Sequence, residues 1–449
     1  MSQTSSPRKK STVRHTRAIQ RERITRQTVA PPPEEVEKLL TDLVHPATYE
    51  QVAHYQRLGM RQRTLTLPVM LAFVLSLLWR QMGAVSEAVR VLQREGMLWT
   101  GTLRVSQQAM SARLRTFPHA LFEAVLLSVL PQMQARWRLR KRPLPLCVQW
   151  ALRHFDHIQA VDGSTLDALL KKVGLLRDTA GTPLAGRMMA ILDIVSRLPH
   201  KLLFEEDSNA HDQSFWEVLV ESLLPKTLLL FDLGFLNFAY FERLCEKTIG
   251  FITRAKTNTV CRVERVLRDT RTLKESLVWV GSGSAACTHL LRLVEVWHQG
   301  QWYRYLTNVT DPAVLPAEVV VALYWQRWRI EDAFLIVKRL LGLSYFYVGS
   351  INGVQVQVWA TWLLYAVLSD LCDEVAHTLQ LPFSCISFER VYRGLYHYTQ
   401  AHHRGEAHDP IAYLCAQENK DLGIVKRRRK GQSAEILELA IPPLPLTCN

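Results

Sequence analysis

Between residues 324 and 338 the sequence YWQRWRIEDAFLIVK places a phenol, a guanidinium, a carboxylate and an ammonium group at regular intervals. On a helix of 3.6 residues per turn, Tyr324, Arg327, Glu331 and Lys338 share a stripe roughly 60° wide. Apolar residues form a seam beside this stripe, which therefore lies where the core meets the surface. A surface pair of Arg327 and Glu331 would stabilise a helix by only ~0.3 kcal/mol and would leave the tyrosine and the lysine unexplained. The spacing predicts that the cationic and acidic side chains of this stripe point into one site.

Two aspartates follow apolar runs that are typical of β-strands. Asp162 lies in AVDGST and Asp232 in LLLFDLGF. Either one alone suits helix capping or a turn. Together with Glu331 they make three carboxylates without Cys or His, a set that suits hard divalent cations such as Mg²⁺ or Mn²⁺. Two such ions about 4 Å apart would bind a scissile phosphate from both sides, activating a nucleophile and stabilising the leaving oxygen.

A mixed sheet is needed to bring these acids together. The sequence predicts five strands, at HIQAVDGST, RMMAILDIVS, HKLLFEED, KTLLLFDLGF and GFITRA. The segments DQSFWEVLVESLL and NFAYFERLCEK predict flanking helices. This order of elements is typical of an α/β fold with helices packed on a mixed sheet. From about residue 258 to 312 the pattern becomes β-rich and polar, which indicates an inserted β subdomain, and helix resumes near Pro316.

The spacing resembles the signature of a known family. Tyr324, two residues, Arg327, three residues, Glu331, six residues and Lys338 match the YREK signature of DDE transposases of the insertion sequence four family. The strings DGST and FDLGF look like the segments that carry that family's first and second catalytic aspartates. The resemblance covers roughly residues 100–375.

The resemblance implies a ribonuclease H-like catalytic core, interrupted by a β-rich insertion, that mobilises a DNA element by cut-and-paste transposition. It implies that Asp162, Asp232 and Glu331 are catalytic and hold two Mg²⁺ or Mn²⁺ ions per active site. Tyr324, Arg327 and Lys338 would then contact the DNA backbone near the transposon end. The partners that it implies are double-stranded DNA, as terminal inverted repeats and as target, and a second copy of the chain in a synaptic complex.

Family members can also hold a flipped base against an aromatic side chain. Trp325 and Trp328 are candidates beside the signature, and Trp297 and Trp302 are candidates in the insertion. Plain packing explains each of the four equally well, so the sequence does not choose among them.

Composition favours a polyanionic partner. The chain has 449 residues, a net charge of +14 and a pI near 9.5, which points to nucleic acid before an anionic membrane. Its eight cysteines are scattered, which argues against zinc and disulfides and for a reducing compartment. The apolar runs at 64–79 and 358–369 are expected to be core helices, since a membrane span needs about 20 apolar residues. We therefore expect no membrane partner, and the resemblance to transposases of bacterial insertion sequences implies a cytoplasmic, nucleoid-associated location in a bacterium.

Basic residues recur outside the core. In the predicted helical region, Ser106 is a plausible N-cap, and the helix after it suits a helix-turn-helix reader or an ordinary helical hairpin. Its polar side would carry Gln107, Gln108, Ser111 and Arg115. The segment RWRLRKR at 136–142 is expected to be a linker or a DNA-facing edge, and KRRRK at 426–430 a solvated tail that could add phosphate contacts.

The sequence divides into six parts: a basic flexible arm at 1–33, a helical DNA-binding domain at 34–145, the first part of the catalytic core at 146–257, the β-rich insertion at 258–315, the second part of the core at 316–400 and a basic tail at 401–449.

Two other functions stay open beside transposition. One is a DNA-binding protein whose catalytic centre has decayed, and the other is a structure-specific nuclease on the same fold.

Overall fold

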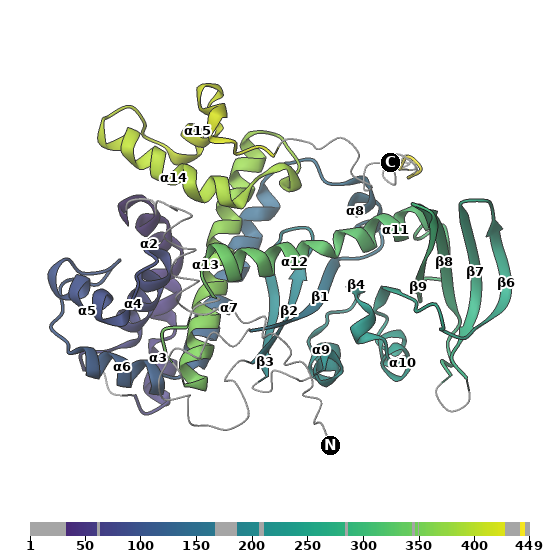
Figure 1. Cartoon of the computed structure of the whole chain (residues 1–449), viewed down its shortest axis with the longest axis horizontal. Helices are drawn as coiled ribbons and strands as arrows, with labels where there is room; N and C mark the ends of the chain where they lie inside the picture. Colours follow the sequence, from purple (N-terminus) through teal and green to yellow (C-terminus); the bar gives the residue numbers. More distant parts are fainter. Residues whose placement is uncertain are drawn as a thin grey trace, which may run out of the picture.

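The computed structural model describes residues 33–60, 63–166, 186–205, 211–282, 286–343, 346–348, 350–426 and 441–444. Most of these residues pack around one sheet with helices on both faces (Figure 1). The mixed α/β class with a large mixed sheet, predicted from the sequence, is confirmed. The arm predicted at 1–33 lies outside the described residues except for Pro33, and so do residues 427–430 of the KRRRK run.

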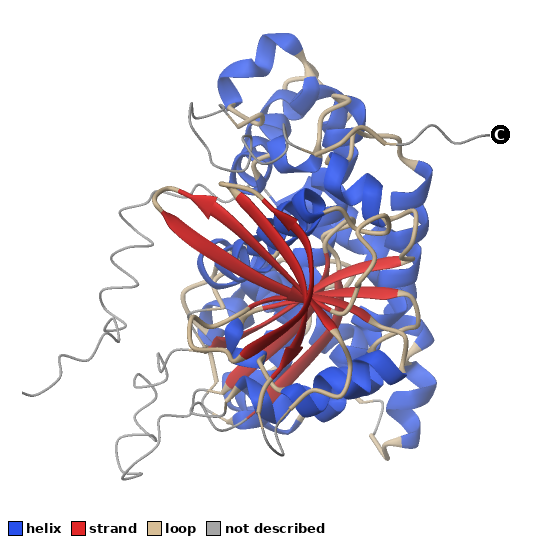
Figure 2. Cartoon of the chain, turned by 90° about the vertical axis from the view of Figure 1, so that its right-hand side faces the viewer, coloured by secondary structure: helices blue, strands red, loops and turns tan. Residues whose placement is uncertain are grey.

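The described strands form a single sheet in the order β3-β2-β1-β4-β5-β9-β8-β7-β6. They are β1 (His157–Thr165), β2 (Arg187–Asp193), β3 (Pro199–Glu205), β4 (Thr227–Phe231), β5 (Gly250–Arg254), β6 (Cys261–Asp269), β7 (Leu273–Val280), β8 (Leu291–His298) and β9 (Gln301–Thr307). Strand β1 pairs in parallel with β4, and β4 with β5, whereas the other neighbours are antiparallel. Figure 2 shows the strands fanning about a common centre, which is the accumulated twist of a large sheet.

The central strands are buried because their sequences are apolar on both sides. Every residue of β4, TLLLF, is buried, as expected for a parallel strand covered by helices on both faces. On one face Leu228 and Leu230 belong to the larger hydrophobic cluster, and on the other Leu229 and Phe231 belong to a second cluster. This alternation means that successive side chains of β4 serve two different cores.

The β-rich segment continues the central sheet. Strands β6 to β9 form an antiparallel meander, and β9 pairs with β5 through Ile252↔Thr307, Thr253↔Leu306 and Arg254↔Tyr305. The segment predicted as an inserted subdomain is therefore joined to the core strands by an unbroken hydrogen-bonded ladder. Its outer strand β6 is exposed along most of its length.

The described helices comprise an N-terminal group, a sheet-covering group and a C-terminal group (Figure 1). The first group is α2 (Pro33–Glu50), α3 (Val52–Arg57), α4 (Leu67–Trp79), α5 (Val85–Arg94), α6 (Gln107–Thr116) and α7 (His119–Leu139). The second is α8 (Leu146–Ala151), α9 (Trp216–Ser222), α10 (Phe238–Glu246), α11 (Ala317–Gln326), α12 (Trp328–Leu335) and α13 (Ile351–Thr378). The third is α14 (Phe388–His403) and α15 (Pro410–Cys415). Short 3₁₀ turns are η3 (Asp212–Phe215), η4 (Leu233–Phe235), η7 (Phe383–Cys385) and η8 (Gln417–Leu422), and η6 (Ile336–Leu340) is a π-helix.

Helix α13 connects the N-terminal helices to the sheet. It packs against α4, α6 and α7 on one side and against β3 on another. One hydrophobic cluster runs from Leu40 in α2 through α13 to Leu395 in α14. By length and composition α13 could cross a membrane, but 83% of its apolar window is buried inside the protein, which accounts for its hydrophobicity.

The pair of helices considered for DNA reading is formed by α5 and α6. Ser106 caps α6 as predicted, because its hydroxyl accepts a hydrogen bond from the backbone N–H of Ala109 at 3.1 Å. Gln107, Gln108 and Arg115 are exposed. The connection from Glu95 to Ser106 is longer than the short turn of a helix-turn-helix motif. The two helices therefore resemble a helical hairpin with a long loop.

Candidate active site

Asp162 and Asp232 occupy equivalent positions on neighbouring parallel strands. The β1–β4 pairing ends at Val161↔Phe231, so the two aspartates are the next residues on their strands. Val161 and Phe231 both point into the second hydrophobic cluster, beneath α9 and α10. Since side chains alternate along a strand, Asp162 and Asp232 point to the opposite face, which α11 and α12 cover. Strand β1 extends past Asp162 to Thr165 through its pairing with β2, so Asp162 lies within the strand and not at its end.

Arg327 connects the first aspartate to the glutamate. Its Nη1 lies 3.0 Å from Asp162 Oδ2, and its Nη2 lies 2.9 Å from Glu331 Oε1. The Arg327 side chain is only 4% exposed, whereas that of Glu331 is 37% exposed. The guanidinium thus forms a buried bridge between β1 and α12, with Glu331 at the open side.

Tyr324 holds the second aspartate. Its hydroxyl donates a hydrogen bond to Asp232 Oδ1 at 3.1 Å. The Arg327 guanidinium lies over the rings of both Tyr324 and Trp328, at 5.7 and 5.5 Å. The predicted stripe of Tyr324, Arg327 and Glu331 therefore points at the two aspartates, and all five side chains meet.

The helix that carries the stripe is not continuous. Arg327 lies between the two helices, as the C-cap of α11 and the N-cap of α12, and its N–H bonds to the carbonyl of Tyr324, three residues back. Lys338 lies in the π-helix η6, where the N–H of Leu341 bonds to the carbonyl of Ile336, five residues back. Such π segments are frequent at functional sites. The angular position predicted for Lys338 assumed a regular α-helix and does not carry over to this wider turn.

Burial dominates the electrostatics of the site. It raises the pKa of Asp162 to about 6, although Arg327 and the Gly163 N–H oppose the rise, and the nearby charges of Glu331 and Asp212 add to it. Burial and the neighbouring Asp232 raise the pKa of Tyr324 above its ordinary range, so the phenol stays protonated and can donate to the carboxylate. Burial lowers the pKa of Arg327, but Tyr324 and the three carboxylates outweigh it and keep the guanidinium charged.

The three carboxylates have the donor chemistry that Mg²⁺ or Mn²⁺ requires, since all their ligand atoms are oxygen. Among the described residues, however, no three acidic, histidine or cysteine side chains are arranged to hold a metal ion. The reason is visible in the geometry, because the Arg327 guanidinium occupies the position between Asp162 and Glu331. In the described arrangement Asp162 and Glu331 are therefore each paired with Arg327.

The tryptophans considered for base contacts are spread over two places. Trp328 is 52% exposed beside Arg327, and Trp325 is half-buried, with its ring 6.2 Å from that of His298. In the β8–β9 hairpin Trp297 and Trp302 are 44% and 36% exposed and contact each other edge to face at 5.5 Å. Exposure favours Trp328 over Trp325 as a surface for DNA.

One pair at the site was not identified from the sequence. Asp212 is the first residue of η3. Its carboxylate, however, accepts a hydrogen bond from Arg187 Nε at 3.0 Å instead of capping the helix. Arg187 begins β2, and no local pattern links it to Asp212, so the pair could not be recognised before the fold was known.

The prediction that RWRLRKR, at 136–142, is a linker or a DNA-facing edge was wrong in part. Arg140 forms ion pairs with Asp370 at 2.8 Å and with Asp373 at 2.9 Å, and its side chain is only 6% exposed. Arg142 is 2% exposed, pairs with Asp373 at 2.6 Å and lies over the Trp137 ring at 4.3 Å. These charges join α7 to α13 inside the protein and do not face DNA.

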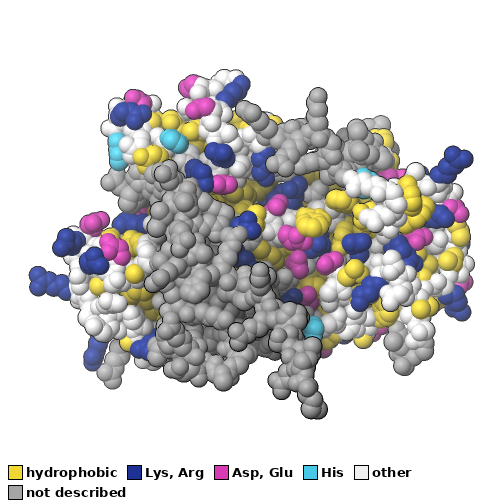
Figure 3. All heavy atoms as spheres, viewed as in Figure 1, with side chains coloured by type: hydrophobic (Ala, Val, Ile, Leu, Met, Phe, Trp, Pro, Cys, Tyr) yellow, Lys and Arg dark blue, Asp and Glu magenta, His cyan; other side chains and the backbone are white. Residues whose placement is uncertain are grey.

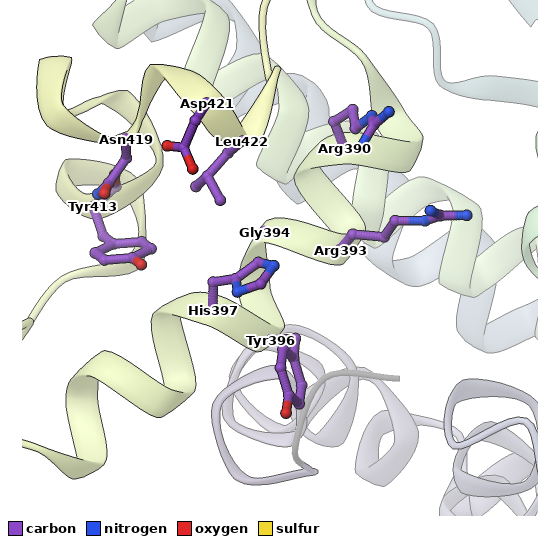
Figure 4. Close-up of a pocket in the computed structure, with 9 residues that line it drawn as sticks. All are labelled: Arg390, Arg393, Gly394, Tyr396, His397, Tyr413, Asn419, Asp421 and Leu422. Atoms are coloured by element: carbon purple, nitrogen blue, oxygen red, sulfur yellow. The ribbon is translucent and has the colours of Figure 1, made fainter. Parts of the chain in front are cut away.

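The surface near the site is mixed in charge. On the face shown in Figure 3, acidic and basic side chains are interspersed where α11 and α12 cross the sheet in Figure 1. A separate cavity of about 380 Å³ lies between α14 and η8 and contains none of the predicted site residues (Figure 4). It is lined by Arg390, Arg393, Gly394, Tyr396, His397, Tyr413, Asn419, Asp421 and Leu422.

Known proteins are similar to part of the chain. It is 28% identical over 191 residues to "Putative transposase y4zB" of Sinorhizobium fredii, covering 40% of this chain and 52% of that protein. It is 25% identical over 186 residues to "Probable transposase for insertion sequence element IS5377" of Geobacillus stearothermophilus, covering 40% and 48%. The matches thus span about half the length of these relatives. A chain of the piggyBac transposase synaptic complex with hairpin DNA aligns over 89% of this chain and 85% of that one, with a TM-score of 0.36 and 12% identity.

A family match covers the site itself. Residues 156–367 match the family described as "Transposase DDE domain". This range contains Asp162, Asp232 and Glu331, and it includes the strands β6 to β9 between the second aspartate and the glutamate. Residues 156–367 of this chain are therefore similar to the transposase DDE domain family.

Proposed function

We propose that this protein is a metal-dependent DNA transposase that cleaves at the ends of its own element and joins those ends to target DNA. The observation that carries the proposal is that Arg327 bonds to both Asp162 and Glu331 while Tyr324, whose ring contacts Arg327, bonds to Asp232. We further propose that β3-β2-β1-β4-β5 is a ribonuclease H-like core and that the YREK spacing places the chain in the insertion sequence four family.

In this proposal Asp162, Asp232 and Glu331 would hold Mg²⁺ or Mn²⁺, two ions per site, and such ions would activate the nucleophile and stabilise the leaving oxygen. Tyr324 orients Asp232 by its hydrogen bond, so that the other carboxylate oxygen stays available. Arg327 neutralises the repulsion between Asp162 and Glu331 before ions bind, and it then turns toward the DNA phosphates. Its release is the step that converts the described arrangement into a loaded site.

DNA contacts surround this centre in the proposal. Lys338 adds a cation to the phosphates at the transposon end, and Trp328 presents the exposed ring beside Arg327 to an unstacked base. Two copies of the chain bring two ends together before joining. A chain acting in this way on bacterial DNA works in the cytoplasm, next to the nucleoid.

The test uses purified protein with a labelled fragment that carries the terminal inverted repeats flanking its own reading frame. Cleavage with joining, only when Mg²⁺ or Mn²⁺ is present, supports the proposal. Cleavage without joining would instead identify a structure-specific nuclease. Binding without cleavage would identify an inactive DNA-binding protein, the alternative favoured by the closed Arg327 bridge.

A further inference from the structure

The glycines that follow the two aspartates face a common neighbour. A Cβ atom built on Gly163 would collide with Asp212 Oδ1 and would lie 3.0 Å from Nε and Nη2 of Arg187. A Cβ atom on Gly234 would lie 2.6 Å from the other carboxylate oxygen, Asp212 Oδ2. Real Cβ atoms essentially never lie this close to another atom, so both positions favour glycine for as long as Asp212 stays in place.

An arginine of the sheet, Arg187, fixes the position of the Asp212 carboxylate. Arg187, at the start of β2, donates to Asp212 Oδ1 and pairs with Thr165 of β1 across the strands. The two side chains are 20% and 16% exposed, so the ion pair is largely shielded from water. The carboxylate therefore has a defined position against the strand that carries Asp162.

The residues after Asp212 are hydrogen-bonded to the segment that follows Asp232. Gln213 Nε2 donates to the carbonyls of Gly234 and Leu236 at 3.0 and 3.2 Å. Trp216 Nε1 donates to the carbonyl of Phe235 at 3.0 Å, and both partners are buried. We name residues 212–216 the bracket, since they join the Asp162 strand to the segment that follows Asp232.

We propose that Asp212 is a positioning residue, whose carboxylate fills the space left by Gly163 and Gly234 and so sets the separation of Asp162 and Asp232. This rests on the proposed function for the role of those two aspartates. The contact lies on the face of β1 opposite to the Asp162 side chain, because Gly163 alternates with it. Asp212 thus acts from behind the site and touches neither DNA nor metal.

The consequence for metal binding follows from geometry. Two aspartates on separate strands share an ion only when their oxygens lie within a few tenths of an ångström of the required distance. Side chains that orient metal ligands typically change metal affinity ~10- to ~100-fold when they are removed. A bulkier group at either glycine would push the bracket outward and change the aspartate separation.

The experiment combines substitutions at the glycine and at the carboxylate. Binding of Mn²⁺ to the DNA-free protein is measured by titration calorimetry for Gly163→Ala, Asp212→Ala and the double variant. Gly163→Ala should weaken Mn²⁺ binding ~10- to ~100-fold, and Asp212→Ala should weaken it less. The double variant should bind like Asp212→Ala alone, since the added methyl group no longer meets a carboxylate. An equal loss from Gly163→Ala with and without Asp212 would overturn the proposal.

Controls separate positioning from folding. Gly101→Ala, where a Cβ meets nothing within 4 Å, should leave Mn²⁺ binding unchanged, and so should Glu217→Ala on the exposed side of α9. Asp212→Asn keeps the shape and should restore most of the affinity that Asp212→Ala loses. Where Gly163→Ala does not fold, Gly234→Ala with and without Asp212→Ala gives the same comparison through the other oxygen. Compensation without any DNA cleavage would support the bracket and count against the proposed function.

Discussion

Arg327 and Asp162 lie 165 positions apart in the chain and are joined by an ion pair of 3.0 Å, with the guanidinium almost fully buried. The same guanidinium bonds to Glu331, so one cation holds two of the three acids. A buried arginine between carboxylates substitutes for the positive charge that a metal-loaded site would contain.

Replacing Glu331 by Gln should abolish metal-dependent cleavage and leave binding to transposon ends nearly unchanged. The amide keeps the shape of the side chain and removes the charge that an ion needs. Cleavage and gel-shift assays measure the two properties separately. Asp332→Asn is the matched control, because this exposed neighbour pairs with Arg329 at 3.5 Å and should leave cleavage intact. Loss of end binding in the Glu331 variant would contradict the assignment.

Replacing Arg327 by Met should destabilise the metal-free protein by up to about 3 kcal/mol, because it leaves the largely buried Asp162 carboxylate without this partner, whereas Glu331 is open to water. Millimolar Mg²⁺ should recover part of this loss and should raise the melting temperature more than it does in the unaltered protein. Thermal unfolding with and without Mg²⁺ measures both effects. Arg329→Met removes a more exposed cation two residues away and should show neither. Equal Mg²⁺ effects in all three proteins would mean that Arg327 does not occupy the ion position.

Cleavage should decline as the pH falls through about 6, because burial raises the pKa of Asp162 to that value from 3.8 and an ion needs the charged form. The folded protein binds this proton more tightly than the unfolded chain, so Asp162 favours folding at low pH and loses that contribution as the pH rises through about 6. Cleavage rates from pH 5 to 8 at several Mg²⁺ concentrations provide the test. Higher Mg²⁺ should move the midpoint to lower pH, and a midpoint independent of Mg²⁺ would exclude this competition.

Replacing Lys338 by Ala should weaken complexes with transposon ends and reduce the slope of log affinity against log salt by about 1, because one phosphate contact is lost. Fluorescence anisotropy at several salt concentrations measures this slope. Arg404→Ala is a control with the same change of charge, since Arg404 is exposed and pairs locally with Glu406. An unchanged slope for Lys338→Ala would show that this residue faces away from DNA.

Replacing Arg140 by Met should lower the free energy of unfolding by up to about 3 kcal/mol, because the buried Asp370 and Asp373 lose one cation and keep only Arg136 at 3.3 Å and Arg142 at 2.6 Å. The folded variant should keep its affinity for DNA, since the guanidinium is inside the protein. Urea unfolding and anisotropy measure the two quantities. Arg138→Met changes an exposed neighbour and should cost little stability. A large loss of DNA affinity in folded Arg140→Met would restore the DNA-facing interpretation.

Local sequence patterns were sufficient to predict the strand and the helix that carry the residues of the site. The apolar run before Asp232 predicted a buried strand, and helical spacing predicted that Tyr324, Arg327 and Glu331 face one way. Both signals are periodic and need only a few consecutive residues. The Ser106 cap was found for the same reason, because a capping side chain bonds to the backbone three residues ahead.

The helical pattern predicted side-chain directions only as far as the chain keeps a regular α-helix. The prediction for Lys338 assumed one α-helix, whereas the chain changes register at Arg327 and widens to a π-helix at Ile336. The wider turn that begins at Ile336 rotates Lys338 relative to the residues before it. No residue in this stretch, such as proline, announces either change in the sequence.

The sequence by itself determined which side chains are available for chemistry and which strands and helix carry them, because these follow from short-range periodicity. Only the tertiary structure decided that Arg327 lies between Asp162 and Glu331, that Asp212 fits behind two glycines, and that Arg140 is buried. It also decided that β9 returns to the edge of β5 and extends the sheet. Each of these relationships joins residues far apart in the chain, and their energies depend on burial and charge partners that no local pattern contains.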